Sequence, residues 1–197
     1  QRLASGHRIS SASEDAAGLA ISSYMQANIR SMGQAERNAN DAVSLIQTGE
    51  GAMNEIGNTM VRLRELSIQA ATDTIGDRER SLINNETQSI LEEVNRIANV
   101  TGYNGVPILN GSADKSNLEF HVGIQNTADD KIQMKLKEYD VRTDQLGISS
   151  IATDTIDGAR DSLNKIDEAI HKIAAKRPNL GAMQKNLVPQ ARNLAVT

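Results

Sequence analysis

The chain of 197 residues contains no cysteine and no tryptophan. Without cysteine it can form no disulfide, thiolate nucleophile or cysteine-based metal site. One Phe and three Tyr bring the aromatic fraction to only 2%, whereas catalytic cores and base-stacking surfaces usually hold more flat side chains. Alanine, isoleucine, leucine and methionine supply the apolar side chains instead, a composition typical of helix–helix packing.

The chain also lacks an excess of basic charge and any long apolar run. Its 25 acidic and 21 basic side chains give a net charge of −4, whereas nucleic-acid binding depends on a basic field. No stretch of about 18 apolar residues occurs, as a membrane-spanning helix would need. The sequence therefore predicts neither a nucleic-acid partner nor a membrane partner.

No arrangement of residues indicates catalysis. The three histidines have no metal-ligand spacing and lie in separate segments, at His7, His121 and His171. The acid pairs Glu14-Asp15 and Glu92-Glu93 fit helix starts or solvated helix faces better than an acid–base dyad. No glycine-rich phosphate loop and no nucleophile elbow is present. We expect no enzymatic activity, no metal site and no cofactor.

The strongest pattern is a series of sixteen positions that alternates steps of three and four residues, here called the seam. Twelve of them are Ala, Ile, Leu or Met, and the members are Gly18, Ile21, Met25, Asn28, Met32, Ala35, Ala39, Ala42, Ile46, Gly49, Met53, Ile56, Met60, Leu63, Ser67 and Ala70. A repeat of about 3.5 residues is typical of a helix that packs along another helix. At ~1.5 Å per residue this helix would be about 80 Å long.

Local signals set the ends of two helices. Ser13 predicts a helix start with Glu14 and Asp15 in the first turn, and the helix should run to about Ala71. After a turn at 72–76, a second helix is predicted from near Asp77 to about Val100, with its stripe at Ile83, Thr87, Ile90, Val94 and Ile97. The two helices should form a hairpin.

The next part of the chain changes character. Asn104-Gly105 and Asn110-Gly111 predict turns. Alternation of apolar and polar residues predicts strands over Leu118–Ile124 and Lys131–Lys137, joined by a six-residue loop as a β-hairpin. The following residues, 139–153, read as a connector with room for one more short strand.

A third helix is predicted from Asp154, with its stripe at Ile156, Ala159, Leu163, Ile166, Ile170 and Ile173. Because Pro178 and Pro189 interrupt the phase, we expect a straight helix to about Lys176 and a broken or frayed one beyond. The predicted fold is mainly α: an elongated rod of long antiparallel helices, coiled-coil-like, with a small β-hairpin region. Residues 1–137, the connector 138–153 and the return helix 154–197 belong to one domain.

One cluster lies off the seam. Arg62, Leu66 and Gln69 are spaced by four and three residues, which predicts one outward face with Leu66 as an exposed apolar side chain. Arg62 lies twelve residues before Thr74 and Glu86 twelve after it, so an antiparallel hairpin would bring them to similar height. A plain solvated face and a contact surface for a partner protein both remain open.

Several segments resemble bacterial flagellin, among them QRLASGHRISSASEDAAGLAIS, AERNANDAVSLIQTGEGAMNEI, RLRELSIQAATDT, YNGVPILNG, SLNKIDEAIHKIAAKR and NLGAMQ. The resemblance implies the core of a flagellar filament subunit, secreted through the flagellar export apparatus and located outside the cell. Other flagellin subunits, an export chaperone and a cap protein are its implied partners. It also implies a truncated core fragment, since the family carries further helices at both ends and outer domains.

In that family an Arg, a Leu and a Gln of the RxRELxxQ segment contact Toll-like receptor 5, and a Glu on the second helix contributes. The matching positions are Arg62, Leu66, Gln69 and Glu86, so the resemblance implies a ligand of this receptor.

Two other classes remain as alternatives. A hook–filament junction protein shares the terminal motifs, although RELSIQAA, the YNG turn and NLGAMQ favour a filament subunit. A secreted helical adhesin or binding module is the second alternative. The chain departs from the family pattern at Pro178, at Val188–Gln190, at Lys185-Asn186 and at His7. These departures bear on the C-terminal end of the rod.

Overall fold

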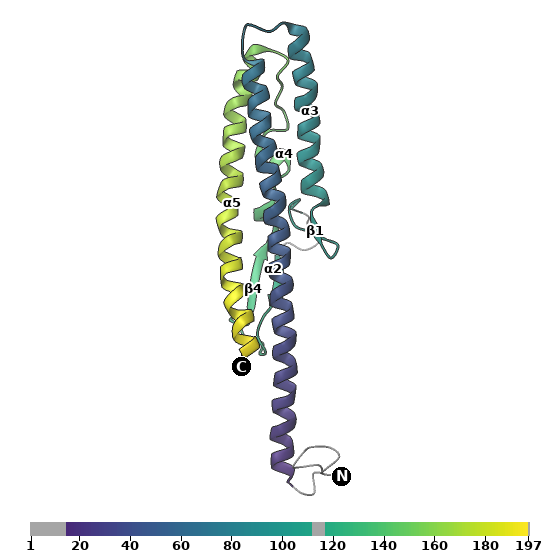
Figure 1. Cartoon of the computed structure of the whole chain (residues 1–197), viewed down its shortest axis with the longest axis vertical. Helices are drawn as coiled ribbons and strands as arrows, with labels where there is room; N and C mark the ends of the chain where they lie inside the picture. The colour runs from purple at the N-terminus through teal and green to yellow at the C-terminus, as the bar shows by residue number, and fades with distance from the viewer. Residues whose placement is uncertain (1–14, 112–116, 197) are drawn as a thin grey trace.

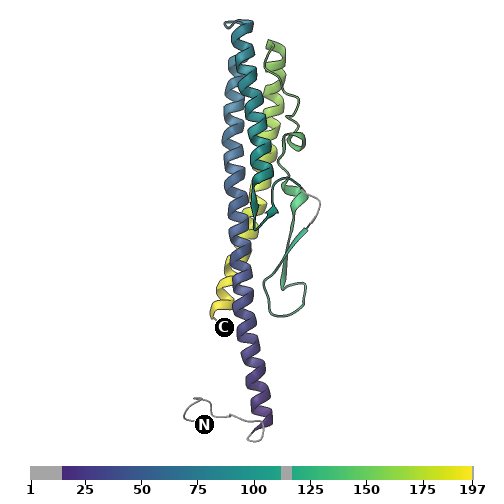
Figure 2. The ribbon, with the colours of Figure 1, turned by 90° about the vertical axis from the view of Figure 1, so that its right-hand side faces the viewer.

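A computed structural model describes residues 15–111 and 117–196, with side chains as far as residue 193. It shows an elongated rod built on three long helices, α2 (Ala16–Ala70), α3 (Asp77–Val100) and α5 (Ile156–Val196) (Figure 1). Both α3 and α5 pack against the upper part of α2, and α2 extends beyond them at its N-terminal end (Figures 1 and 2). The mainly α rod predicted from the sequence is confirmed.

The seam forms the core of the rod along most of α2. All eleven of its members from Ala35 to Ala70 are buried, and most are completely inaccessible. Close approach is needed at Gly49, where an added Cβ would lie 3.3 Å from Cγ2 of Ile108. The five members from Gly18 to Met32 are not buried, because α5 does not cover this end of α2 (Figure 1).

The start of α2 differs from the prediction. Asp15 is the N-cap, with an extended backbone, and its Oδ1 accepts a hydrogen bond of 2.8 Å from the amide of Gly18. Its short carboxylate therefore satisfies a free amide of the first turn, so Asp15 precedes the helix instead of lying in that turn. The predicted cap Ser13, together with Glu14 and His7, lies outside the described residues.

The second helix has the predicted ends, and its buried face is slightly rotated from the predicted stripe. Ile90 and Ile97 are only half-buried, and the buried residues are Arg80, Ile83, Thr87, Leu91, Val94 and Ala98. The rotation arises because α3 contacts both α2 and the connector, so its buried arc lies between the two.

The first predicted turn joins two short strands, β1 (Gly102–Tyr103) and β2 (Val106–Pro107). Asn104 and Gly105 both have positive φ, 49° and 78°, as the tight two-residue hairpin turn requires.

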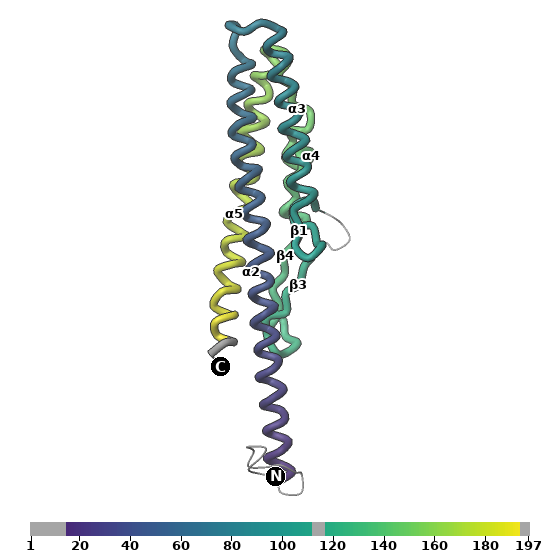
Figure 3. Tube along the Cα trace, turned by 45° about the vertical axis from the view of Figure 1, so that its right-hand side comes forward, coloured from purple at the N-terminus to yellow at the C-terminus, as the bar shows by residue number. Residues whose placement is uncertain are grey.

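The larger hairpin pairs β3 (Asn117–His121) with β4 (Lys131–Lys135), so both strands are shorter than predicted. The side chain of Asp130 organises the loop: it accepts hydrogen bonds from the amide and the hydroxyl of Thr127. A Cβ at Gly123 would lie 1.5 Å from the Asp130 carboxylate. Residues 122–124 therefore belong to the loop and not to β3. The hairpin lies beside α2, where Asn38 donates to the carbonyl of His121 at 2.9 Å (Figure 3).

The connector contains helical turns and no strand between residues 139 and 153, all of which are described. A 3₁₀ turn, η1 (Leu136–Tyr139), ends the predicted strand early, because Leu136 and Tyr139 both turn into the core. The short helix α4 (Thr143–Leu146) follows and ends at Gly147, whose φ is +83°. The expected short strand is therefore wrong.

The return helix runs without interruption to Val196, through both prolines. The predicted break after Lys176 is wrong for a reason of packing. Pro178 and Pro189 lie on the exposed side of α5, whereas Leu180 and Leu187 are fully buried. Burial of these leucines opposes the cost of about 3 kcal/mol that an interior proline imposes on a helix.

Within the described ranges, no helix is both long enough and apolar enough to cross a bilayer.

Because the seam is buried on one side of α2, shortening a side chain should destabilise the fold more on the seam than on the exposed side. Ile56 is fully buried and Ile68 is 49% exposed. Ile56→Ala should lower the free energy of unfolding by about 2–5 kcal/mol, and Ile68→Ala by less than about 0.5 kcal/mol. Urea denaturation followed by helical circular dichroism measures both. Equal effects would contradict a core that lies on one side of α2.

Candidate partner-binding surface on α2 and α3

An ion pair connects α2 and α3 near the upper end of the rod. Arg62 Nη2 lies 2.8 Å from Oε1 of Glu86, and Nε of the same guanidinium lies 3.2 Å from that oxygen. A second acid, Glu65, lies 3.3 Å from Nη1. Hydrogen bonds to Glu86 and then to Glu65 raise the pKa of Arg62 above its ordinary value. Arg62 and Glu86 therefore lie at similar height on the two helices, as predicted, and the structure adds the ion pair between them.

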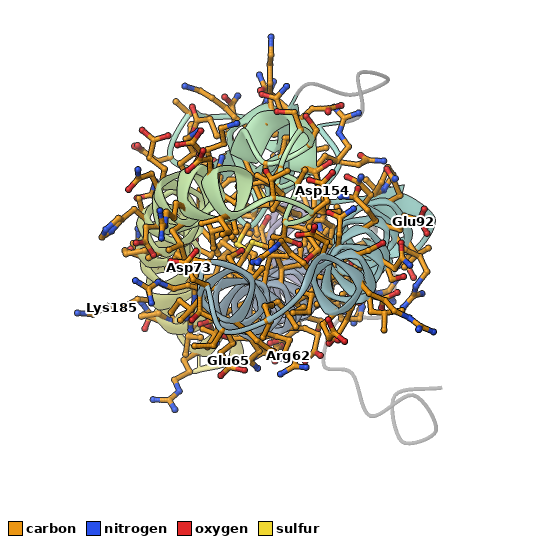
Figure 4. The ribbon with its side chains drawn as sticks, turned by 90° about the horizontal axis from the view of Figure 1, so that it is seen from above. Arg62, Glu65, Asp73, Glu92, Asp154 and Lys185 are labelled. Atoms are coloured by element: carbon orange, nitrogen blue, oxygen red, sulfur yellow. The ribbon has the colours of Figure 1, made fainter. Side chains whose placement is uncertain are left out.

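These charged groups are open to solvent. The side chains of Arg62, Glu86 and Glu65 are 52%, 47% and 62% exposed. Seen down the rod, Arg62 and Glu65 point outward at the same edge, away from Glu92 and Lys185 (Figure 4). An exposed pair contributes about 0–1 kcal/mol to folding, so these side chains remain available to a partner at little cost to the fold.

The register of the two helices depends on a buried arginine at the tip of the hairpin. Arg80 on α3 is 3% exposed and donates to the carbonyl of Ala70, at the end of α2. It also donates to the carbonyls of Thr72, at 3.3 Å, and Ile75, at 3.0 Å. One guanidinium thus binds three carbonyls of the turn, which fixes how far α3 lies along α2 and sets Glu86 opposite Arg62.

The opposite side of α3 is anchored by the connector. Thr87 and Thr153 share a buried hydroxyl–hydroxyl hydrogen bond of 3.1 Å. Asn84 accepts from the amide of Thr153 at 2.9 Å, and Gln88 donates to the carbonyl of Ile151 at 3.1 Å. Because these bonds lie on either side of Glu86 in sequence, they limit rotation of α3 and keep Glu86 on the open face.

Leu66 does not lie where the sequence analysis placed it. Gln69 is exposed, as predicted, but Leu66 is only 1% exposed and packs with Ala70, Ile83 and Ala159. The physical reason is that α2 contacts two helices, so its buried arc is wider than a single seam and includes Leu66. The outward apolar residue predicted at this position is therefore wrong, and the structure brings together only Arg62, Gln69 and Glu86 on the surface.

The surface has an apolar member that the sequence analysis missed. Leu82, one turn before Glu86 on α3, is 63% exposed. The i, i+4 spacing of Leu82 and Glu86 could have revealed it. Exposed apolar side chains beside an arginine are typical of protein contact surfaces. We call Arg62, Glu65, Gln69, Leu82 and Glu86 the hairpin surface.

Among the described residues no group of three or more His, Asp or Glu side chains could hold a metal ion. His121 lies on β3 and His171 on α5, so the sequence expectation of separated histidines holds for these two.

Comparison with known proteins assigns this helical rod to a family. A model of the bacterial flagellin N-terminal helical region matches residues 1–114. A flagellin of Halalkalibacterium halodurans is 34% identical over 194 residues, which cover 98% of this chain and 70% of that protein. Flagellin 1 of Proteus mirabilis is 43% identical over 150 residues, covering 76% of this chain. The chain belongs to the bacterial flagellin family.

Solved structures agree with this fold. The crystal structure of Bacillus cereus flagellin superimposes with a TM-score of 0.71 at 26% identity, covering 80% of this chain and 88% of that one. A flagellar hook-associated protein of Vibrio parahaemolyticus gives a TM-score of 0.73 at 13% identity, covering 94% of each chain. At this low identity the second match shows the fold alone. The fold therefore does not distinguish a filament subunit from a hook–filament junction protein. The higher sequence identities are those to flagellins.

The relatives differ in how much of their length the chain matches. It spans 70% of the Halalkalibacterium halodurans protein but 40% of the Proteus mirabilis protein. It spans 27% of the phase 1 flagellin of Salmonella naestved.

Alanine substitutions at Leu66 and Gln69 should have very different effects on the free energy of unfolding, because only Leu66 is buried. Leu66→Ala removes a buried side chain and should lower the free energy of unfolding by about 2–5 kcal/mol. Gln69 lies three residues away on the exposed face, so Gln69→Ala should change the free energy of unfolding by less than about 0.5 kcal/mol. Urea denaturation of both variants measures the difference. A small effect for Leu66→Ala would contradict the burial of this side chain.

Proposed function

We propose that the chain is the structural core of a subunit of the bacterial flagellar filament, secreted and located outside the cell. Membership of the flagellin family supports this function most directly. The rod supports it physically: three long helices packed along a buried seam form a stiff unit whose polar faces can contact neighbouring subunits. In this proposal the main partners are other flagellin subunits, and the protein performs no catalysis.

Abundance in isolated filaments tests this proposal against the junction-protein alternative. A filament subunit repeats along the whole filament, whereas a junction protein occupies only one end of it. Filaments sheared from cells that carry the gene should therefore contain peptides of this chain as their dominant component by quantitative mass spectrometry. The matched control is the same preparation from cells with the gene deleted. Trace amounts in intact filaments would contradict the proposal and favour a junction protein.

A second proposed function is recognition by Toll-like receptor 5 through the hairpin surface. The observation that favours it is the juxtaposition of Arg62 and Glu86 on neighbouring helices at 2.8 Å, with both side chains about half exposed. Gln69 lies on the same open side of α2. Exposed arginines beside apolar side chains are frequent sources of binding energy at protein interfaces.

In this proposal Leu66 contributes indirectly. Since its side chain is buried against Ile83 and Ala159, it supports the packing of α2 beneath the charged residues and offers little area to a receptor. Leu82, exposed one turn from Glu86, supplies the apolar contact that Leu66 cannot supply.

Charge removal at the hairpin surface should weaken receptor binding without unfolding the rod. Arg62→Ala and Glu86→Ala should each reduce affinity for the receptor ectodomain by about tenfold or more, as measured by surface plasmon resonance. Arg96→Ala is the matched control, because Arg96 forms a similarly exposed ion pair with Glu93 at 2.6 Å farther along α3. Unchanged affinity of Arg62→Ala, with helical content retained, would remove the hairpin surface from the receptor site.

A further inference from the structure

Two asparagines of the chain are followed directly by glycine, and both lie in the segment after α3. Asn104 belongs to the turn between β1 and β2, and Asn110 lies three residues beyond β2. A glycine has no side chain to shield its amide nitrogen, so this nitrogen can approach the side-chain carbonyl carbon of the preceding asparagine. Such a pair favours loss of the asparagine side-chain amide, and the surroundings of each pair decide how readily the reaction occurs.

The first pair, Asn104-Gly105, is open to solvent. Both residues are exposed, and a Cβ added at Gly105 would meet no atom within 4 Å. Within residues 15–111 and 117–196, no group accepts a hydrogen bond from the Gly105 amide. Water therefore reaches the two groups that would react, and no contact of the fold holds them apart.

The second pair, Asn110-Gly111, is packed against the connector. Asn110 is half-buried, and the carbonyl before it, of Leu109, accepts a hydrogen bond of 3.0 Å from the amide of Val141. A Cβ added at Gly111 would overlap the carboxylate of Asp140. A negative charge this close disfavours removal of the Gly111 amide proton. Reaction of Asn110 therefore requires local opening of the segment.

We propose that Asn104 is a site of spontaneous deamidation, at which the folded chain forms aspartate and isoaspartate while Asn110 stays intact. The Gly105 nitrogen loses its proton to water or hydroxide and bonds to Cγ of Asn104. The side-chain nitrogen leaves as ammonia, which closes a five-membered succinimide. Water then adds to one of the two ring carbonyls and breaks its bond to nitrogen, so the reaction consumes no oxidant, reductant or cofactor.

The two products differ in their effect on the β1–β2 hairpin, which contacts α2 (Figure 3). Aspartate keeps the main chain and tolerates the φ of 49° at this position. Isoaspartate sends the main chain through the side-chain methylene, and the added atom does not fit the two-residue turn that pairs Tyr103 with Val106. Because this hairpin places the fully buried Ile108 against Gly49 of α2, isoaspartate should loosen it from α2 and destabilise the core.

Incubation of the full chain in mildly alkaline buffer tests the site. Trypsin cleavage after Arg96 and Lys115 leaves both asparagines in one peptide, so electron-transfer fragmentation measures them together. In the folded chain Asn104 should lose its amide at least about tenfold faster than Asn110, which reacts only after local opening. Equal rates, or faster reaction at Asn110, would overturn the proposal. In urea the two rates should become similar, and a difference that persisted there would refute the role of the fold.

Two variants separate the reaction from its effect on stability. Asn104→Gly keeps the two-residue turn but has no side-chain amide to lose. Asn104→Asp, measured fresh, carries the charge without the added main-chain atom. After incubation a protein isoaspartyl methyltransferase should label position 104 of the wild-type chain and not of Asn104→Gly.

Urea denaturation then measures what isoaspartate does to the rod. The isoaspartate-containing fraction of the incubated wild type should unfold at a lower urea concentration than fresh wild type. Incubated Asn104→Gly should unfold like its fresh control, and fresh Asn104→Asp like fresh wild type. No loss of stability in the isoaspartate fraction, or an equal loss in Asn104→Asp, would contradict loosening of the hairpin by the added atom. These results are independent of the filament and receptor proposals, since none of them involves a partner protein.

Discussion

Packing between α2 and α5 determines the position of every other element. The seam of α2 is buried without interruption from Ala35 to Ala70, and its small residues allow close approach. At Gly49 an added methyl group would lie only 3.3 Å from Cγ2 of Ile108. Ile108 directly follows β2, so the β1–β2 hairpin places this side chain in the core. The hairpin and the connector therefore rest on a surface that the two long helices create. Without that interface the β3–β4 hairpin would be a pair of short strands with no layer to cover it.

Hydrogen bonds of buried polar groups fix the register of the helices and the position of the connector, which apolar packing alone leaves variable. A helix pair with a uniform seam can slide by one turn at little cost, since similar side chains replace one another. Between α2 and α3, Arg80 opposes such sliding at the tip, because it donates to the carbonyls of Ala70, Thr72 and Ile75. Within the connector, burial alone would raise the pKa of Asp140, but hydrogen bonds from Arg142 lower it below its ordinary value. The connector is thus held by directional bonds as well as by its apolar residues.

Periodicity predicted the long helices because the seam positions from Ala35 to Ala70 are all buried on one side of α2. The ends of α3 were predicted closely, since turn residues and the first acidic turn surround Asp77. The orientation of Leu66 could not be predicted, because it depends on a second helix that contacts α2 from another direction. The C-terminal end of β3 depends on how the Asp130 side chain fills the space beside Gly123 across the hairpin loop, which the alternation of apolar and polar residues does not reveal. The effect of the two prolines on α5 could not be judged without knowing which side of the helix faces solvent.

These two prolines have a mechanical consequence. Each proline lacks the amide that would bond to the carbonyl four residues before it, at Ala174 for Pro178 and at Lys185 for Pro189. Both prolines are exposed on the surface of α5, where water can solvate those carbonyls. The helix is therefore most compliant at these two turns and stiffest in the segment before them. When the rod bends, curvature should concentrate in the C-terminal half of α5, which holds both prolines, while the upper part of the rod, which carries the hairpin surface, stays straight.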